Sequence, residues 1–125
     1  MHLAWRRARK MKIAILGGGV AGVSSAIALK HKGFDVSIYE RHKSALTIGA
    51  GIVVWPNAAY VLEQLGVLEE VESLSGYPKK MQRVSNTNLE LGSIDIDAIN
   101  QHMGYQSLSI LRSDFQSTLI SKLSL

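Results

Sequence analysis

The 125-residue sequence contains no cysteine, which excludes a disulfide scaffold, a thiolate metal site and a cysteine nucleophile. It also lacks an apolar run of the roughly 20 residues that a membrane span needs, and a secretory h-region near its start. The four histidines show no metal-ligand spacing, so no metal site is predicted. With 46% hydrophobic and 19% charged residues, the composition is that of a globular protein with a buried core. We therefore expect one cytoplasmic folding unit.

Acidic residues are absent from positions 1–12, which carry five basic ones (Arg6, Arg7, Arg9, Lys10 and Lys12). The net charge of +4 belongs to this segment, because the nine remaining basic residues face ten acidic ones. Binding to nucleic acid or an anionic membrane would need a basic stripe on the folded surface, and the later sequence supplies none. We predict a disordered basic leader over residues 1–11 and a folded unit over 12–125. Met11, directly before the first expected strand, is an alternative start of the protein.

The first third of the folded unit has the pattern of a strand, a helix and a second strand. Residues 12–16 are an apolar run closed by three glycines, which suits a strand buried on both faces at the centre of a parallel sheet. A helix is predicted over about 20–32, with Gly33 at its end and with small and apolar residues at helical spacing (Ala21, Ser25, Ala28 and Leu29). Residues 34–40 alternate polar and apolar types and predict the second strand. The fold class is therefore α/β, with a right-handed Rossmann-type βαβ unit and a parallel sheet.

Weaker patterns organise the remaining residues. We predict an ordered loop over 41–55, a short amphipathic helix over 67–71, a hairpin of strands 81–84 and 89–96 around Asn86-Thr87-Asn88, and a strand over 108–111. Asp95 and Asp97 are expected to alternate along the second hairpin strand and to face water. A helix opens at Pro56 and ends at Gly66, with one apolar face (Ala58, Val61, Leu62 and Leu65). A last helix starts with Ser113 as its N-cap and has another apolar face (Phe115, Leu119, Ile120 and Leu123).

The glycines between the first strand and helix form the pattern Gly17-x-Gly19-x-x-Gly22. Alone this pattern is a weak signal, but its place between a strand and a helix is typical of a dinucleotide site. Gly17 permits a tight turn, Gly19 lets the backbone approach a pyrophosphate, and Gly22 allows close helix–strand packing. The helix N-terminus at Val20 and Ala21 offers N–H groups to that phosphate. The sequence thus predicts a phosphate-binding loop for an adenine dinucleotide, with a flexible turn as the structural alternative.

Glu40 ends the second strand about 20 residues after the glycines, where a carboxylate accepts hydrogen bonds from a ribose diol. Its charge argues against a 2′-phosphate at this site, although neighbouring Arg41 weakens that argument. We therefore expect FAD or NAD rather than NADP. A solvated strand end is the alternative for Glu40.

With the residues after Glu40 included, the sequence resembles the FAD-dependent aromatic-ring hydroxylases, the monooxygenases related to para-hydroxybenzoate and salicylate hydroxylases. Residues 13–40 carry the part of the likeness that every dinucleotide-binding βαβ unit shares. The run Gly49-Ala50-Gly51-Ile52 followed by Pro56-Asn57-Ala58 and Leu62-x-x-Leu65-Gly66 is more specific. The third stretch is Leu111-Arg112-Ser113-Asp114-Phe115-Gln116-x-x-Leu119, and the likeness spans about residues 12–125.

The resemblance implies that residues 12–125 are the N-terminal part of an FAD-binding domain. Gly51 and Ile52 would then pass near the flavin, and Arg112 would reach the phosphate or ribityl region. The loop Gly17, Gly19, Val20, Ala21 and Gly22 would surround the pyrophosphate, and Glu40 with Arg41 would bind the adenosine ribose. In the complete enzyme NADH or NADPH would reduce the flavin, and one oxygen atom would be placed on an aromatic or similarly electron-rich small molecule.

The resemblance also implies that later family segments are needed for chemistry, because the Asp-Gly and Gly-Asp motifs and the substrate-covering sheet come after position 125. No catalytic residue is therefore predicted, and the chain alone is expected not to hydroxylate anything. Two alternatives stay open: an NAD-binding regulatory or sensor module without catalysis, and a fragment that folds poorly and binds nothing. For Arg112 the alternative is a solvated arginine at a helix start.

Overall fold

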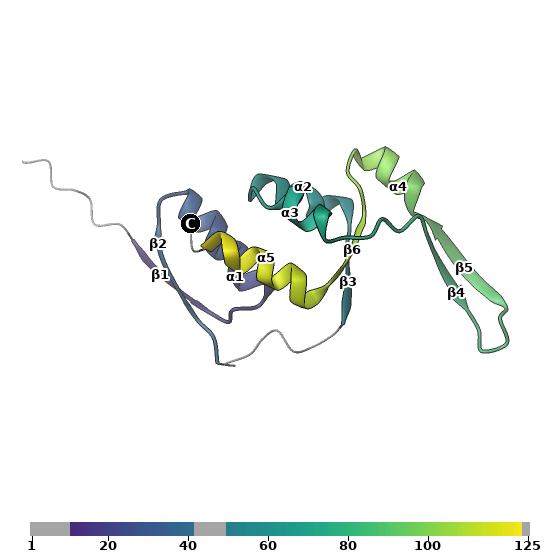
Figure 1. Cartoon of the computed structure of the whole chain (residues 1–125), viewed down its shortest axis with the longest axis horizontal. Helices are drawn as coiled ribbons and strands as arrows, with labels where there is room; N and C mark the ends of the chain where they lie inside the picture. Colours follow the sequence, from purple (N-terminus) through teal and green to yellow (C-terminus); the bar gives the residue numbers. More distant parts are fainter. Residues whose placement is uncertain (1–10, 42–49, 124–125) are drawn as a thin grey trace, which may run out of the picture.

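The computed structural model describes residues 11–41 and 50–123. The predicted basic leader lies outside these residues, except for Met11, and so do positions 42–49 of the predicted loop. Figure 1 shows the elements in order: β1 (Lys12–Leu16), α1 (Val20–His31), β2 (Asp35–Tyr39), β3 (Gly51–Val54), α2 (Pro56–Gln64), α3 (Leu68–Ser73), β4 (Lys80–Val84), β5 (Glu90–Asp95), α4 (Ile96–Met103), β6 (Leu108–Leu111) and α5 (Arg112–Leu123).

The βαβ unit is confirmed. Strands β1 and β2 pair in parallel from Lys12↔Asp35 to Leu16↔Tyr39, and α1 connects them. Gly33 follows the end of α1 with a φ of +83°, a conformation that glycine adopts without strain. The α/β fold class predicted from the sequence is therefore the fold observed.

One burial prediction for this unit is wrong. Strand β1 alternates between exposed and half-buried residues, and Leu16 is 85% exposed, because β2 is the only described strand that pairs with it. Helix α1 buries Val23, Ala26 and Ile27, whereas Ala21, Ser25 and Ala28 are exposed. The larger apolar side chains remove more surface from water and set the orientation of the helix.

A second sheet joins segments far apart in the sequence. Strand β3 pairs antiparallel with β6, from Gly51↔Leu111 to Val54↔Leu108, so the prediction of an ordered loop over 41–55 is wrong at its end. The sequence of this segment has no local period that predicts a strand, because its partner, β6, lies more than 50 residues later in the chain. Helix α5 begins at Arg112, directly after β6, so Ser113 stands inside the helix and is not its N-cap.

Helix α2 begins at Pro56 and is followed by Gly66 at a φ of +70°, as predicted. Of the predicted apolar face, Leu62 and Leu65 are buried and Ala58 packs against the core. Val61 is 47% exposed, so the prediction is wrong for this residue, and Ala59 is buried instead. The predicted hairpin is present as β4 and β5, but its second strand ends at Asp95. Asp95 is the last residue of β5, and its carboxylate accepts a hydrogen bond from the N–H of Ala98 at 3.0 Å and caps α4. Asp97 lies in α4, so its predicted place along the strand is wrong, whereas both aspartates are exposed as predicted.

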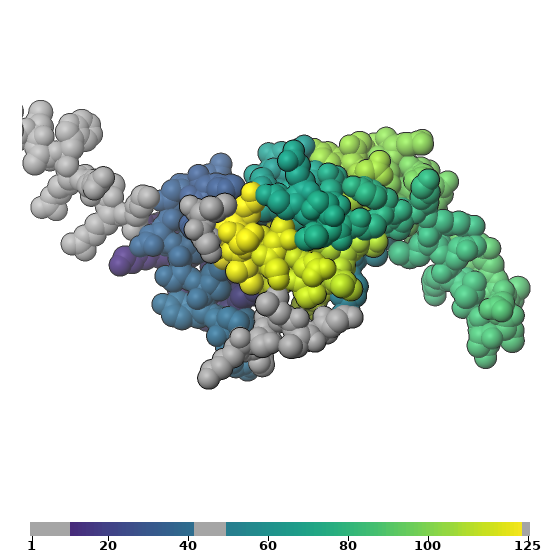
Figure 2. All heavy atoms as spheres, viewed as in Figure 1, coloured from purple at the N-terminus to yellow at the C-terminus, as the bar shows by residue number. Residues whose placement is uncertain are grey.

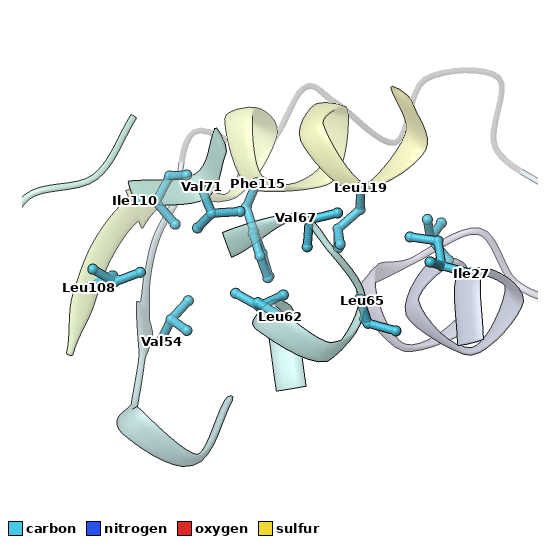
Figure 3. Close-up of a cluster of buried hydrophobic side chains, with 11 residues drawn as sticks. Ile27, Val54, Leu62, Leu65, Val67, Val71, Leu108, Ile110, Phe115 and Leu119 are labelled. Carbon is cyan, nitrogen blue, oxygen red and sulfur yellow. The ribbon is translucent and has the colours of Figure 1, made fainter. Parts of the chain in front are cut away.

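One hydrophobic cluster connects the two sheets through the helices. Figure 3 shows Phe115 and Leu119 of α5 directed toward Leu62, Leu65 and Val67, with Val54 and Leu108 of the second sheet beside them. Ile27 brings α1 into the same cluster. The hairpin β4–β5 projects from this body (Figures 1 and 2). Helix α5 therefore lies at the centre of the fold, in contact with α1, α3 and β6.

Candidate dinucleotide site

The backbone of the loop after β1 requires glycine at two positions. Gly17 has a φ of +109°, and its N–H donates to the carbonyl of Tyr39 at 2.8 Å, which turns the chain out of the sheet. A Cβ on Gly22 would lie 1.9 Å from the carbonyl oxygen of Gly17. Only glycine lets α1 approach the strand this closely, as the motif predicts.

Gly19 is placed differently. It is the N-cap of α1, with extended backbone at φ −72° and ψ −178°, and a Cβ there would meet no heavy atom within 4 Å. The first turn of α1 starts with Val20, Ala21 and Gly22, and the N–H of Val23 is the first to bond back, to the carbonyl of Gly19 at 2.9 Å. These first-turn donors and the helix dipole suit an anion, and the space beside Gly19 suits a pyrophosphate.

Glu40 closes the loop from the end of β2. Its Oε2 accepts a hydrogen bond from the N–H of Gly18 at 2.7 Å. An ionised carboxylate has about four acceptor positions, so this bond is compatible with further bonds to a ribose diol. A cleft beside it is lined by Leu16, Gly17, Ile38, Tyr39, Glu40 and Arg41. Leu16 and Tyr39, 85% and 61% exposed, add apolar walls next to the carboxylate, which suits an adenosine.

A third contact to the loop comes from a residue that the sequence did not single out. The Gln116 side chain of α5, only 3% exposed, donates from Nε2 to the carbonyl oxygen of Gly18. Gln116 belongs to the third stretch of the family resemblance, from which only Arg112 was predicted as a site residue. The signal that could have found it is its place beside Phe115 and three residues before Leu119, on the helix face that is buried.

The remaining predicted residues gather at the second sheet. Gly51 pairs with Leu111, Ile52 pairs with Ile110, and the N–H of Arg112 donates to the carbonyl of Ala50 at 2.9 Å. A second cleft lies here, lined by Gly51, Ile52, Val53, Leu74, Ser109, Ile110, Leu111 and Asp114. Arg112 is one helical turn before Gln116, about 6 Å along the axis of α5, so this helix links the second cleft to the phosphate-binding loop.

Neither a cluster of metal ligands nor a membrane-spanning helix is found in the described ranges, 11–41 and 50–123. No group of three or more histidine, aspartate or glutamate side chains there could hold a metal ion. No helix in this part of the chain has the length and apolarity to cross a membrane.

Comparison with known proteins decides the family. Residues 10–120 match the model of an FAD binding domain. The chain belongs to the FAD-binding monooxygenase family. An FAD-dependent urate hydroxylase of Mycolicibacterium vanbaalenii is 33% identical over 111 residues, which are 88% of this chain and 28% of that protein.

Solved structures agree with this FAD-binding assignment. The chain aligns with a tetrameric form of 2-methyl-3-hydroxypyridine-5-carboxylic acid oxygenase at a TM-score of 0.78 and 29% identity, over 93% of this chain and 29% of that one. It aligns with Klebsiella pneumoniae HpxO, solved with FAD and uric acid, at 0.72 and 27%, over 89% and 28%. The chain thus spans less than a third of the length of these relatives and is an FAD-binding segment like the one they contain.

Proposed function

We propose that this segment binds FAD with the pyrophosphate over Gly19 and the start of α1, and with the adenosine ribose at Glu40. The observation that carries this proposal is the loop itself. The carbonyl of Gly17 lies against Gly22, and the N–H of Gly18 is bonded to Glu40. A Cβ on Gly19 would meet no heavy atom within 4 Å, which leaves space for a ligand beside the first-turn N–H groups of α1. Arg41 lines the same cleft as Glu40, where the adenosine ribose is proposed to bind.

The flavin end is proposed for the second cleft. Gly51 and Ile52 supply backbone along one side, and Arg112 starts α5 at the same edge of the sheet. A guanidinium offers a planar set of donors to phosphate oxygens or ribityl hydroxyls. Since α5 connects this edge to the phosphate-binding loop, an extended dinucleotide that follows α5 would reach both groups of residues.

In the complete protein the bound FAD would supply the redox chemistry of a monooxygenase that uses NADH or NADPH. We propose an aromatic or similarly electron-rich small molecule as the substrate, by likeness to relatives named for urate and for a hydroxypyridine carboxylic acid. The residues described here bind and orient the cofactor, and none of them is assigned a catalytic step.

The test is the visible absorption spectrum of the purified chain after incubation with FAD and removal of free flavin. We expect the original chain to retain a flavin band. The dissociation constant for FAD should be about tenfold higher in Glu40→Ala, because this variant loses both the ribose acceptor and the bond to Gly18. The matched control is Glu69→Ala on the exposed surface of α3, which should bind FAD as the original chain does.

Two results would reject the proposal. A folded, monodisperse chain that retains no flavin but binds NAD in calorimetry would favour the NAD-binding regulatory module. Equal weakening by Glu40→Ala and Glu69→Ala would mean that flavin is held elsewhere.

A further inference from the structure

The peptide groups on either side of Gly18 are held by two side chains from distant parts of the sequence. The N–H of Gly18 donates to Glu40 at 2.7 Å, and its carbonyl accepts from Gln116, 98 residues later in the chain. Gly18 and Gln116 are both buried. Water therefore has little access to this carbonyl, and the amide of Gln116 is its described partner.

The geometry of a trans peptide gives this contact a consequence for the ligand. The carbonyl of one residue and the N–H of the next point in opposite directions across the planar group. With the Gly18 carbonyl fixed toward α5, the N–H of Gly19 is directed to the opposite side. A Cβ on Gly19 would also meet no heavy atom within 4 Å, and the pyrophosphate is proposed beside this residue.

The preceding peptide obeys the same rule. The N–H of Gly18 points to Glu40, and the carbonyl of Gly17 points the other way, to within 1.9 Å of where a Cβ on Gly22 would be. Both peptide planes of the loop are thus set, one by Glu40 and the other by Gln116.

We infer that Gln116 is a positioning residue of the cofactor site: its buried amide fixes the Gly18–Gly19 peptide so that the Gly19 N–H faces the pyrophosphate. This inference rests on the proposed function and extends it to a residue that itself faces away from the ligand. Because Gln116 is one turn after Arg112, a displacement of α5 at the flavin edge would also reach the phosphate-binding loop.

The experiment compares Gln116→Met, which keeps the length of the side chain but has no donor, with Thr118→Val. Thr118 is also buried on α5, and its hydroxyl bonds to the Asp114 carbonyl within the helix, so its loss leaves the loop untouched. Binding of ADP and of adenosine is measured by calorimetry, together with ¹H–¹⁵N spectra of chains labelled at the 11 glycines. Gln116→Glu is the second variant, because its acid form can donate to Gly18 and its ionised form cannot.

We expect Gln116→Met to weaken ADP about tenfold while adenosine changes less than about twofold, since only the pyrophosphate uses the Gly19 N–H. The Gly19 amide resonance should move in Gln116→Met and stay in place in Thr118→Val. For Gln116→Glu, the ratio of its ADP affinity to that of the original chain should be higher at low pH than at high pH.

Equal losses for ADP and adenosine, or an unmoved Gly19 resonance, would reduce Gln116 to a packing role and overturn the inference. If the original chain bound neither ADP nor FAD, the proposed function would fail. The Gly19 resonance of the unliganded variants would still decide whether Gln116 orients the peptide.

Discussion

At the scale of single residues, two glycines of the same motif are required for different reasons, and this difference can be tested. A Cβ on Gly22 would overlap a backbone oxygen, whereas one on Gly19 would meet open space. We expect Gly22→Ala to lower the free energy of unfolding by about 1–3 kcal/mol, because the loop must shift away from α1. Gly19→Ala should unfold like the original chain in urea but bind FAD more weakly, since its methyl group enters the proposed pyrophosphate position. A Gly22→Ala chain as stable as the original would contradict the close approach.

The sequence predicted residues whose role is set by local backbone geometry. Gly17, Gly19 and Gly22 follow from the turn between a strand and a helix, and Glu40 follows from the length of a βαβ unit. Their binding of FAD stays a prediction. Gln116 could not be predicted in the same way, because its contact with Gly18 depends on how α5 packs on α1, and no local period encodes that.

At the scale of elements, one ion pair joins the short helix α3 to α5. Lys122 Nζ lies 2.6 Å from Glu70 Oε1, and the hydrogen bond from Lys122 holds the pKa of Glu70 below its ordinary value of 4.5. The pKa of Glu70 is therefore lower in the folded state than in the unfolded state. The ion pair stabilises the fold at pH values above the unfolded-state pKa, and this contribution is lost as the pH falls through the folded-state pKa.

We therefore expect Lys122→Met to lower the melting temperature slightly at pH 7, by about 2 °C or less, since Glu70 is exposed and Lys122 is partly exposed. The difference from the original chain should shrink as the pH falls from 7 through the lowered folded-state pKa of Glu70, and vanish where Glu70 is protonated in both states. Thermal melts across this range, with Lys79→Met as the exposed control, measure it. A deficit that persists unchanged at low pH would mean that Lys122 acts through its apolar stem instead.

The elements that the sequence missed share a physical cause. Strand β3 has four residues and depends on β6 for its hydrogen bonds, so no alternation inside it could reveal a partner strand that begins only at Leu108. Helix α4 follows β5 without a break, and Asp95 ends one element while it caps the next. Elements of this length are fixed by tertiary contacts, whereas α1 has 12 residues between clear glycine signals.

At the scale of the whole molecule, stability is expected to be unevenly distributed. The core cluster ties α1, α2, α3, α5 and the second sheet together, whereas the hairpin β4–β5 extends beyond it (Figure 2). Every residue of β5 is exposed, and the hairpin carries exposed apolar side chains (Val84, Leu89, Leu91 and Ile94). An isolated two-stranded hairpin is marginally stable in water.

Native-state hydrogen exchange should reveal this division. We expect the backbone N–H groups of β4 and β5 to exchange at least about 100-fold faster than those of β3 and β6, because the hairpin can open without exposing the core. Association of chains through the exposed hairpin residues would slow its exchange, so the measurement is repeated at a tenfold lower protein concentration. Slow hairpin exchange that disappears on dilution would identify association. Slow exchange that remains would mean that the hairpin is stabilised within the monomer and that the expected division of stability is wrong.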